Sequence, residues 1–472
     1  MTTTMTTASP MELLARLDRH ATDSPHRPAV REVGSGRTIT WRQLADAVRD
    51  SSAQIAQRVP AGAVVILRCP NACNFHIAFL GALAAGATVF PIPPDSVERE
   101  FTAAADKSSA VATIDERLVI HSLHSSETWV ANPCHGVDQG LQSGLLLQSS
   151  GTTALPKIVR RDARSLDAVC ANMVHAIGIT AADHVLSCVP LCHSYGLEHG
   201  LLAPVFAGAT VHLAQGFDLA TVRRELAGSG ITVFPAVPSI YEMLGNLPEA
   251  QSCFPTLRVA YSAGGPLPAS VFEKVRDAYG LRVGQLYGAT EIGSVTFAHP
   301  AADHFDPASV GQAMNGVELK IDASSQLHVR ATSMMSGYVG DDSPLTHDGF
   351  FPTGDLARID ALGDLFITGR LKLLIDVGGL KVNPLEVEQT ICQHPAVAAC
   401  VVVPLWLSET VSRLKAIVTL ADPASPPTTG DLRRFVRQRL TAHKVPRVFE
   451  VRESLPRSAT GKILRHLLVK TT

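Results

Sequence analysis

Residues 145–157, Leu-Leu-Leu-Gln-Ser-Ser-Gly-Thr-Thr-Ala-Leu-Pro-Lys, place a short apolar run directly before a loop of small and hydroxyl-bearing residues. This pattern predicts a buried strand that ends in a loop. Backbone N–H groups of small residues can approach an anion closely, and the terminal lysine adds a positive charge. The stretch is not a Walker loop, because Pro156 replaces its second glycine and Ile158 replaces the hydroxyl that binds Mg²⁺. These residues alone leave a phosphate-binding loop and a polar surface turn both open.

Strand and helix patterns alternate along most of the chain, which predicts an α/β fold of sheets covered by helices. Thr40-Trp-Arg-Gln43 has the residues of a capping box and predicts the start of an amphipathic helix. The apolar region 77–92 predicts a core helix followed by a strand. Apolar runs typical of short buried strands occur at residues 64–67, 88–90, 185–188, 210–213 and 232–234.

The last part of the chain predicts a second, smaller unit. Asn383 and Pro384 fit the cap and the first turn of a helix. The following pattern predicts two strands, a second helix and a last strand, at residues 397–403, 414–420, 431–441 and 447–451. We therefore expect a large N-terminal α/β domain over residues 1–370 and a small α+β domain over residues 371–472.

Composition and charge limit the possible partners. The chain has 472 residues, 46% of them hydrophobic, which is enough to build more than one core. Its 41 Lys and Arg against 43 Asp and Glu give no basic field for nucleic acid or an anionic membrane. We find no membrane span and no secretory signal, and the nine cysteines lack zinc-site spacing. We therefore expect a cytoplasmic protein with reduced thiols that binds small molecules or a modest protein surface.

Further short motifs follow the loop in order, at residues 285–291 (QLYGATE), 353–356 (TGDL), 368–370 (TGR), 378–379 (GG), 383–388 (NPLEVE) and 461–462 (GK). Together with the loop, this series resembles the adenylate-forming superfamily of acyl-CoA synthetases, carrier-loading acyl-AMP ligases, adenylation domains and firefly-type luciferases. The resemblance covers the chain from about Ala29 to about Leu468. It implies that the small domain is a mobile lid with its hinge near Lys372, although Leu373 departs from the acidic residue usual there.

The resemblance implies that the protein uses ATP and Mg²⁺ to activate a carboxylic acid. The carboxylate attacks the α-phosphate, pyrophosphate leaves, and an acyl-AMP forms. The acyl group then passes to the phosphopantetheine thiol of CoA or of an acyl carrier protein. Because two anions must meet, catalysis depends mostly on positioning and on neutralising charge.

Four residues form the expected catalytic set. Lys462 is expected to bridge the substrate carboxylate and the α-phosphate. Thr290 is expected to bind the α-phosphate, and Glu291 is the expected Mg²⁺ ligand because Mg²⁺ at a nucleotide takes a carboxylate plus phosphate oxygens. His193 is expected beside the acyl group. Without the resemblance, Lys462 would be an ordinary solvated lysine near the C-terminus.

The motifs also imply how ATP is bound. Tyr287 is expected to stack on adenine, Asp355 to bind the ribose, and Arg370 to reach the sugar or the phosphate. Without the resemblance, Tyr287 would be an aromatic residue of the core, and Asp355 and Arg370 would be ordinary surface charges. Ala154 replaces a glycine usual in the family, which costs about 1 kcal/mol if the position needs φ > 0. The full expected ATP-binding set is Ser149, Ser150, Gly151, Thr152, Thr153, Lys157, Gly264, Gly265, Tyr287, Gly288, Asp355 and Arg370.

The acyl pocket is expected to be uncharged. No aspartate that could bind an α-ammonium group occurs between Pro190 and Phe217, so we expect a fatty or aryl acid rather than an amino acid. Gly378 and Gly379 are expected to line the path of the thiol, and neither a strong basic cluster for CoA nor a carrier-docking patch stands out. The expected walls of the acyl pocket are His193, Ser194, Tyr195, Ala236, Val237, Ala263, Gly264 and Gly288.

Two alternatives to a ligase stay open. A luciferase-like oxidoreductase that oxidises its own acyl-adenylate needs no further motif, and oxygen consumption would identify it. A non-catalytic nucleotide-binding or interaction protein could keep the same fold. The joint presence of Lys462, Glu291, Asp355 and Arg370 argues against this second alternative, and a lack of pyrophosphate release with every acid would support it.

Overall fold

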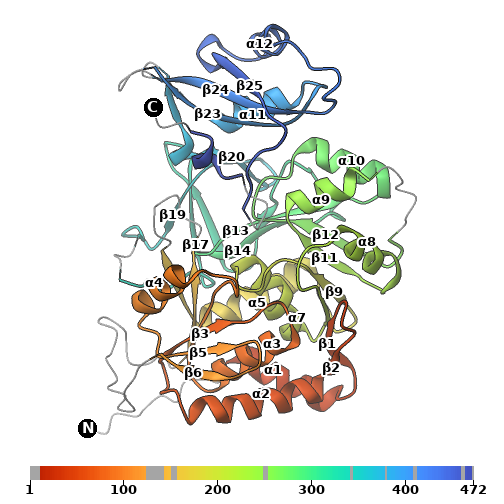
Figure 1. Cartoon of the computed structure of the whole chain (residues 1–472), viewed down its shortest axis with the longest axis vertical. Coiled ribbons are helices and arrows are strands. Elements are labelled where there is room, and N and C mark those ends of the chain that lie inside the picture. The colour runs from red at the N-terminus through yellow and green to blue at the C-terminus, as the bar shows by residue number, and fades with distance from the viewer. Residues whose placement is uncertain are drawn as a thin grey trace. The chain divides into compact units, whose positions relative to one another are not determined.

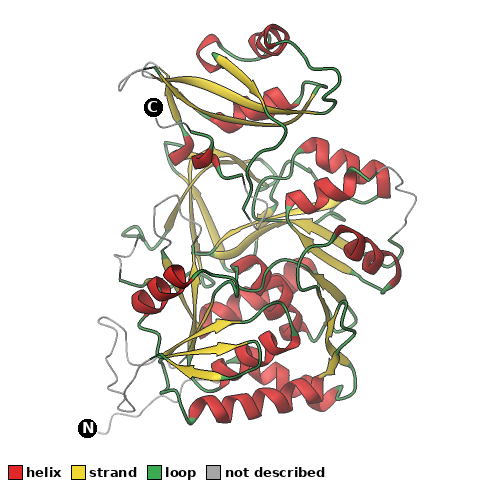
Figure 2. Ribbon diagram, in the orientation of Figure 1, coloured by secondary structure: helices red, strands yellow, loops and turns green. Residues whose placement is uncertain are grey.

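The computed structural model describes residues 11–123, 143–149, 157–247, 254–340, 344–377, 380–407, 412–458 and 463–469. Figures 1 and 2 show the chain as alternating helices and strands, which confirms the predicted α/β fold. The chain divides into two compact units, of which the first holds residues 1–318 and 330–351 and the second holds residues 319–329 and 352–472. The boundary after Arg370 and the hinge at Lys372 remain predictions.

A nine-stranded sheet is one of two sheets in the first unit, with strand order β15-β14-β13-β12-β11-β9-β10-β1-β2. Neighbouring strands from β13 to β1 are parallel, so their carboxyl ends lie at one edge of the sheet. The strands are β1 (Pro28–Glu32), β2 (Thr38–Thr40), β9 (His184–Ser187), β10 (Thr210–Leu213), β11 (Val233–Ala236), β12 (Val259–Ser262), β13 (Val283–Ala289), β14 (Gly293–Ala298) and β15 (Gln312–Ala313).

The second sheet of this unit has seven strands in the order β18-β8-β7-β4-β3-β5-β6. The strand predicted at residues 145–147 is β7, and β8 returns antiparallel beside it with Leu147 opposite Val159. The strands are β3 (Val64–Arg68), β4 (Thr88–Pro91), β5 (Ala112–Asp115), β6 (Ile120–Ser122), β7 (Gly144–Gln148), β8 (Ile158–Asp162) and β18 (Gly337–Tyr338).

Helices pack between the two sheets and on their outer faces. Val185 belongs to the core that both sheets share, whereas the next residue, Leu186, belongs to the core on the opposite face, since successive strand residues point to opposite sides. The shared core contains α1 (Glu12–Asp23), α2 (Trp41–Ala56), α3 (Cys73–Ala84), α5 (Ala163–Ile177) and α7 (Ala203–Ala207). The outer cores contain α4 (Glu98–Ser108) on one sheet, and α8 (Leu219–Gly228), α9 (Pro238–Gly245) and α10 (Ala269–Tyr279) on the other (Figure 1).

The predicted capping box at the start of α2 is confirmed. The Thr40 hydroxyl accepts from the Gln43 N–H at 3.3 Å, and the Gln43 side chain accepts from the Thr40 N–H at 2.9 Å. Two N–H groups that the helix cannot pair internally are thereby satisfied. The predicted core helix and strand of residues 77–92 are also confirmed, as α3 and β4.

The second unit contains three sheets. Their orders are β16-β17-β19-β20, β21-β22 and β23-β24-β25. The first two consist of β16 (Val317–Ile321), β17 (Gln326–Ala331), β19 (Phe351–Ile359), β20 (Leu365–Arg370), β21 (Ile375–Val377) and β22 (Leu380–Val382). The third consists of β23 (Val397–Trp406), β24 (Ser412–Leu420) and β25 (Val448–Val451), with α11 (Pro384–Cys392) and α12 (Thr429–Arg437) in its core.

One predicted helix of this unit has the wrong limits. Helix α12 spans Thr429–Arg437, whereas the sequence predicted residues 431–441. The Thr428 hydroxyl accepts from the Asp431 N–H at 3.1 Å, so Thr428 is the cap and Asp431 the third helical residue. Asn383 is the cap of α11, as predicted, because its side chain accepts from the Leu385 N–H.

The cysteines of the described residues are all free, as expected for reduced thiols. Burial raises the pKa of Cys188 to about 12, which keeps this thiol protonated and unreactive. Within the same residues we find no group of three or more His, Cys, Asp or Glu side chains placed to hold a metal ion. None of the helices described is both long and apolar enough to cross a bilayer.

Candidate active site

Four loops meet at the carboxyl edge of the nine-stranded sheet. They follow the neighbouring strands β9, β11, β12 and β13. These loops contain residues 193–195, 237, 263–265 and 290–291, which the sequence assigns to the acyl pocket and the nucleotide. Open α/β sheets bind ligands outside the carboxyl ends of their strands. The fold therefore brings together predicted site residues that lie far apart in the sequence.

Tyr338 connects the loop lysine to the expected metal ligand. The Lys157 ammonium lies 4.4 Å from the centre of the Tyr338 ring, within cation–π range. The Tyr338 hydroxyl donates to Glu291 Oε1 at 3.1 Å. Lys157 and Glu291 are thereby held on one aromatic side chain, although residues 158–290 separate them in the sequence. The sequence did not predict a role for Tyr338, because no neighbouring residue indicates that its hydroxyl binds a carboxylate far away in the sequence.

The predicted phosphate loop is closed at its base. Ser149 is buried, and its N–H donates to the Lys157 carbonyl at 2.8 Å, which pairs the first and last residues of the motif. The roles of the residues between them stay predictions. Those that lie outside the described residues are Ser150, Gly151, Thr152, Thr153 and Ala154.

The turn between β13 and β14 carries Thr290 and Glu291, both half-buried. Tyr287 is half-buried in β13, and its stacking on adenine stays a prediction. A Cβ at Gly288 would lie 2.4 Å from the Gly293 carbonyl oxygen, so only glycine fits this close approach of the two strands. The tight hairpin fixes where the Glu291 backbone leaves the sheet.

The Gly264-Gly265 turn follows β12. Gly264 has φ +84°, and a Cβ there would find its nearest neighbour, Val237 Cγ1, at 3.8 Å. Backbone conformation rather than lack of space therefore requires glycine at Gly264. Just before this turn, the Ser262 hydroxyl is 1% exposed and has no hydrogen-bond partner among the described residues. An unsatisfied buried hydroxyl is available to a ligand at this edge.

The predicted acyl wall begins at His193, which precedes the short helix α6 (Ser194–Leu197). Burial lowers the pKa of His193, so its ring is neutral at pH 7. The Tyr195 hydroxyl donates to the Ala236 carbonyl at 3.1 Å, which ties α6 to the end of β11. Burial also raises the pKa of Tyr195, so the phenol remains a donor. The remaining predicted walls, Val237 and Ala263, are buried at the same edge.

In the second unit, Asp355 and Arg370 are cross-strand partners of β19 and β20. The Arg370 Nε lies 2.7 Å from Asp355 Oδ1, with side chains 39% and 11% exposed. The pair presents a carboxylate and a guanidinium side by side, which are the groups expected to bind a ribose. Their contact with nucleotide stays a prediction.

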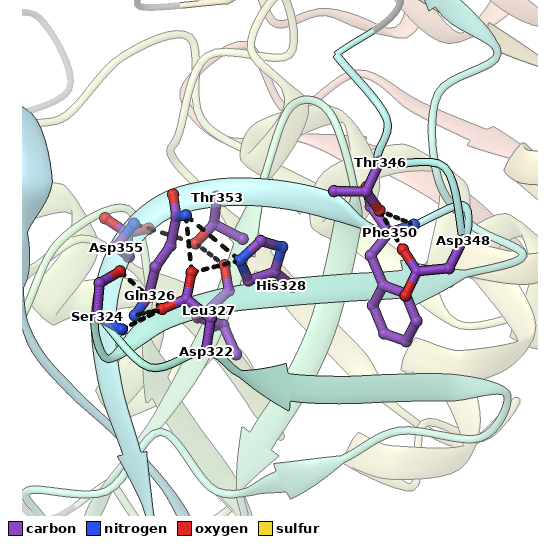
Figure 3. A network of polar contacts seen from close by, with 10 residues as sticks. All are labelled: Asp322, Ser324, Gln326, Leu327, His328, Thr346, Asp348, Phe350, Thr353 and Asp355. Carbon is purple, nitrogen blue, oxygen red and sulfur yellow. Dashed lines mark hydrogen bonds and ion pairs between the residues drawn. The ribbon is translucent and has the colours of Figure 1, made fainter.

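A polar network supports Asp355 (Figure 3). The Asp322 carboxylate accepts hydrogen bonds at the turn between β16 and β17, from Ser324 and His328 among others. The Thr353 hydroxyl donates to the Leu327 carbonyl at 2.8 Å and accepts from the Asp355 N–H at 3.1 Å. The backbone before Asp355 is thus anchored to the neighbouring strand β17.

Three further predicted residues lie outside the described residues. They are Gly378, Gly379 and Lys462, whose roles stay predictions. Strands β21 and β22, on either side of the glycine pair, are antiparallel partners. Lys372, the predicted hinge, is exposed in the short 3₁₀-helix η2 (Leu371–Leu373).

The second unit carries several exposed arginines within residues 434–447. Arg434, Arg437, Arg439 and Arg447 are all exposed on α12 and the segment that follows it. Arg433 donates to the Arg447 carbonyl at 2.8 Å, which places α12 beside the start of β25. We call these five arginines the basic surface; Arg433 is half-buried, and Arg434 is paired with Asp431 at 3.2 Å.

Family models match both parts of the chain. The model for AMP-binding enzymes matches residues 17–339, and the model for the C-terminal domain of AMP-binding enzymes matches residues 386–462. The two matched segments contain the expected loop, the Thr290–Glu291 turn and the Gly-Lys motif at their expected places.

Several known proteins are similar to the chain. A malonate–CoA ligase of Arabidopsis thaliana is 32% identical over 69% of this chain and 60% of its own length. An oxalate–CoA ligase of the same plant is 26% identical over 96% of this chain and 97% of its own. The crystal structure of ATP-bound MatB from Rhodopseudomonas palustris has a TM-score of 0.86, covers 97% of this chain and 98% of MatB, and is 22% identical. At that identity, the structural match shows the fold.

The family models, the two CoA ligases and the shared fold agree with the resemblance of the motif series. The chain therefore belongs to the AMP-binding enzymes, as an adenylate-forming ligase of the acyl-CoA synthetase type.

Proposed function

We propose that this enzyme condenses ATP with a carboxylic acid that carries no charge beyond its reacting carboxylate. The products are acyl-AMP and pyrophosphate, and the enzyme then transfers the acyl group to CoA. The contact of Lys157, Tyr338 and Glu291 carries the proposal. It places a cation and a carboxylate together at the sheet edge, beside the loops that hold His193 and Gly264. A site for a polyphosphate and its counter-ion needs these two charges in a fixed arrangement.

The chain's own groups divide the work of the first half-reaction. Lys157 supplies positive charge at the base of the phosphate loop, and Thr290 supplies a hydroxyl for the α-phosphate. Lys462 is assigned the carboxylate and the α-phosphate, whose negative charges otherwise repel each other. These groups act by holding the two anions in line and by lowering their repulsion.

The residues present fit Mg²⁺. Glu291 is half-buried, and no lysine or arginine of the described residues forms an ion pair with it. The Tyr338 hydroxyl donates to Oε1 and thereby restrains the Glu291 carboxylate. Bound Mg²⁺ would neutralise phosphate oxygens, and Glu291 would be its protein ligand.

The charge of the pocket selects the class of acid. Malonate and oxalate, which the two plant ligases are named for, carry a second carboxylate that needs a cation. In the described part of the wall, His193 is neutral. Glu198, which accepts from Ser194 of this wall, holds Arg161 in a buried ion pair. Among the described residues of the wall no cation is left for a second carboxylate, so we propose a fatty or aryl monocarboxylic acid.

The basic surface supports an anionic thiol substrate. The short helix η3 (Ala442–Lys444), which lies within this segment, packs against β22, directly after the predicted thiol path. The phosphates of CoA would meet these arginines, whereas free pantetheine would not. An acidic carrier protein would meet the same charges, so the acceptor test includes CoA and a holo-carrier protein.

The proposal is tested by pyrophosphate release with a panel of acids. Benzoate-type and medium-chain fatty acids should support release, while malonate, oxalate and amino acids should not. In a second step, CoA, dephospho-CoA, pantetheine and a holo-carrier protein are compared as acceptors. Thioester formation with CoA at a lower KM than with pantetheine is expected. Release with malonate but not with any monocarboxylic acid would overturn the proposed class of substrate.

A further inference from the structure

A buried ion pair lies behind the predicted site. Arg161, the residue before the last of β8, is 0% exposed, and Glu198, which follows α6, is 2% exposed. Their Nη1 and Oε1 atoms are 2.6 Å apart. Removing two charges from water is costly, and an apolar pair of similar size is often equally stable in such a position. Stability alone therefore gives no reason for this pair.

Each partner of the pair also contacts a segment of the predicted site. Glu198 Oε1 accepts from the Ser194 hydroxyl at 3.0 Å, and its Oε2 accepts from the Ser294 hydroxyl at 2.7 Å. Ser194 is the first residue of α6, next to His193. Ser294 is in β14, three residues after Glu291. One carboxylate thus joins the acyl wall to the strand that follows the expected metal ligand.

Arg161 makes the corresponding contacts on its other nitrogens. Its Nη2 donates to the Ser333 carbonyl at 3.0 Å, and its Nε donates to the Ser165 hydroxyl at 3.0 Å. The Ser333 hydroxyl in turn donates to the Ile292 carbonyl at 2.8 Å. Ile292 directly follows Glu291, so both members of the pair reach the same turn. Arg161 itself lies on the strand that returns from the phosphate loop.

A second buried chain of hydrogen bonds ends on the same carboxylate. Burial lowers the pKa of His199 to about 3 and raises that of Tyr261, so both side chains are neutral. The Tyr261 hydroxyl then donates to His199 Nδ1 at 2.5 Å, and His199 Nε2–H faces the Ser294 hydroxyl at 3.4 Å. The Ser294 hydroxyl in turn donates its hydrogen bond to Glu198. Tyr261 is in β12, directly before Ser262 and the Gly264 turn.

The helix itself is irregular at this point. Glu198 opens a π-helical turn, η1 (Glu198–Leu202), between α6 and α7. Such π-helical turns inside helices are rare and occur frequently at functional sites. Here the interruption directs Glu198 inward while α6 presents His193 and Ser194 at the sheet edge.

From these contacts we infer that the Arg161–Glu198 pair positions the site. It sets the distance between the acyl wall at His193 and the turn at Glu291, and through these segments the alignment of the acid with the α-phosphate. Neither residue touches substrate, so both are positioning residues. The inference rests on the proposed adenylation reaction.

Asp183 provides a matched control. Its carboxylate is also buried, paired with Arg258 at 3.1 Å and bonded by the Thr232 hydroxyl at 2.7 Å. Asp183 directly precedes β9, at the amino edge of the sheet, opposite the predicted site. Asp183→Asn therefore removes a buried carboxylate charge from a pair whose arginine is 42% exposed, without disturbing the loops at the carboxyl edge.

The test compares Glu198→Gln, Ser294→Ala and Asp183→Asn with the wild-type enzyme. Acid-dependent exchange of labelled pyrophosphate into ATP gives kcat and KM, the acyl-AMP burst counts active sites, and thermal unfolding reports stability. A purely structural role lowers the number of active sites and leaves kcat per site and KM unchanged. A positioning role changes kcat per site and the KM of the acid.

We expect Glu198→Gln to lower kcat per active site by about 10- to 100-fold, the loss typical of a misplaced reacting group. Ser294→Ala should lower kcat per active site by a smaller factor. If Glu198→Gln does not fold, Ser294→Ala tests the positioning role in its place. Asp183→Asn should unfold at lower temperature yet keep the wild-type kcat per site. Equal kcat per site in all three variants would overturn the positioning role while leaving the proposed function intact. A wild-type enzyme without exchange would refute the proposed function, and the positioning role with it.

Discussion

Tyr338→Phe isolates one hydrogen bond of the predicted site. The change removes the hydroxyl that donates to Glu291 Oε1 at 3.1 Å but keeps the ring beneath the Lys157 ammonium. A hydrogen bond to a charged group contributes about 1.5 kcal/mol. If this bond orients Glu291 for the metal and the nucleotide, its loss should lower kcat/KM for ATP about tenfold.

Tyr338→Leu adds a second, separable loss. It also removes the ring, and with it a cation–π contact of about 0.5–1 kcal/mol. The total decrease should then be about 20- to 50-fold. ATP–pyrophosphate exchange at saturating acid measures both variants.

Tyr279→Phe is the control for the loss of a tyrosine hydroxyl. Tyr279 ends α10, and its hydroxyl donates to the Leu244 carbonyl at 3.0 Å, among residues that are not part of the predicted site. This variant should keep wild-type exchange. Wild-type activity in Tyr338→Phe, or an equal decrease in Tyr338→Phe and Tyr279→Phe, would refute the role of Tyr338.

Three further outcomes are expected. Because burial lowers the pKa of His199 from 6.5 to about 3, the unfolded chain takes up this proton first as the pH falls, and the free energy of unfolding should decrease by up to about 1.4 kcal/mol per pH unit below 6.5. Urea unfolding of His199→Asn should show a shallower decrease, and an unchanged slope would contradict the assignment. Gly264→Ala should cost about 1–2 kcal/mol of stability because of its φ of +84°, whereas Gly265→Ala, without such a φ, should be tolerated; equal losses would exclude the backbone explanation. Lys462→Ala should lower adenylation by at least about 10²-fold while thioester formation from preformed acyl-AMP largely survives, and equal loss of both steps would contradict its role.

Local patterns predicted the elements of the fold well where a short-range cause decides them. The capping box at Thr40 fixed the start of α2, and Asn383 fixed the start of α11. Helix α12 was misplaced because Asp431 was taken as its first residue, although Thr428 and Asp431 together satisfy the capping-box pattern. The error therefore came from an overlooked local motif rather than from tertiary structure.

The candidate site was predictable only in part. The motif series gave the segments that meet at the sheet edge, because each motif is contiguous in the sequence. The contacts between segments were missed, since nothing local pairs Arg161 with Glu198 or Tyr338 with Glu291. Glu198 did offer one clue, because it is the single carboxylate of the largely apolar segment 194–207, and a buried carboxylate requires a partner.

The most direct test of the proposed chemistry follows the carboxylate oxygen. A monocarboxylic acid with isotopically labelled carboxylate oxygens is incubated with the enzyme, ATP, Mg²⁺ and CoA, and the products are weighed by mass spectrometry. Attack of the carboxylate on the α-phosphate, followed by thiol attack on the acyl carbon, should leave one labelled oxygen in AMP, with unlabelled pyrophosphate. Unlabelled AMP, or formation of ADP and labelled phosphate, would contradict an acyl-adenylate intermediate.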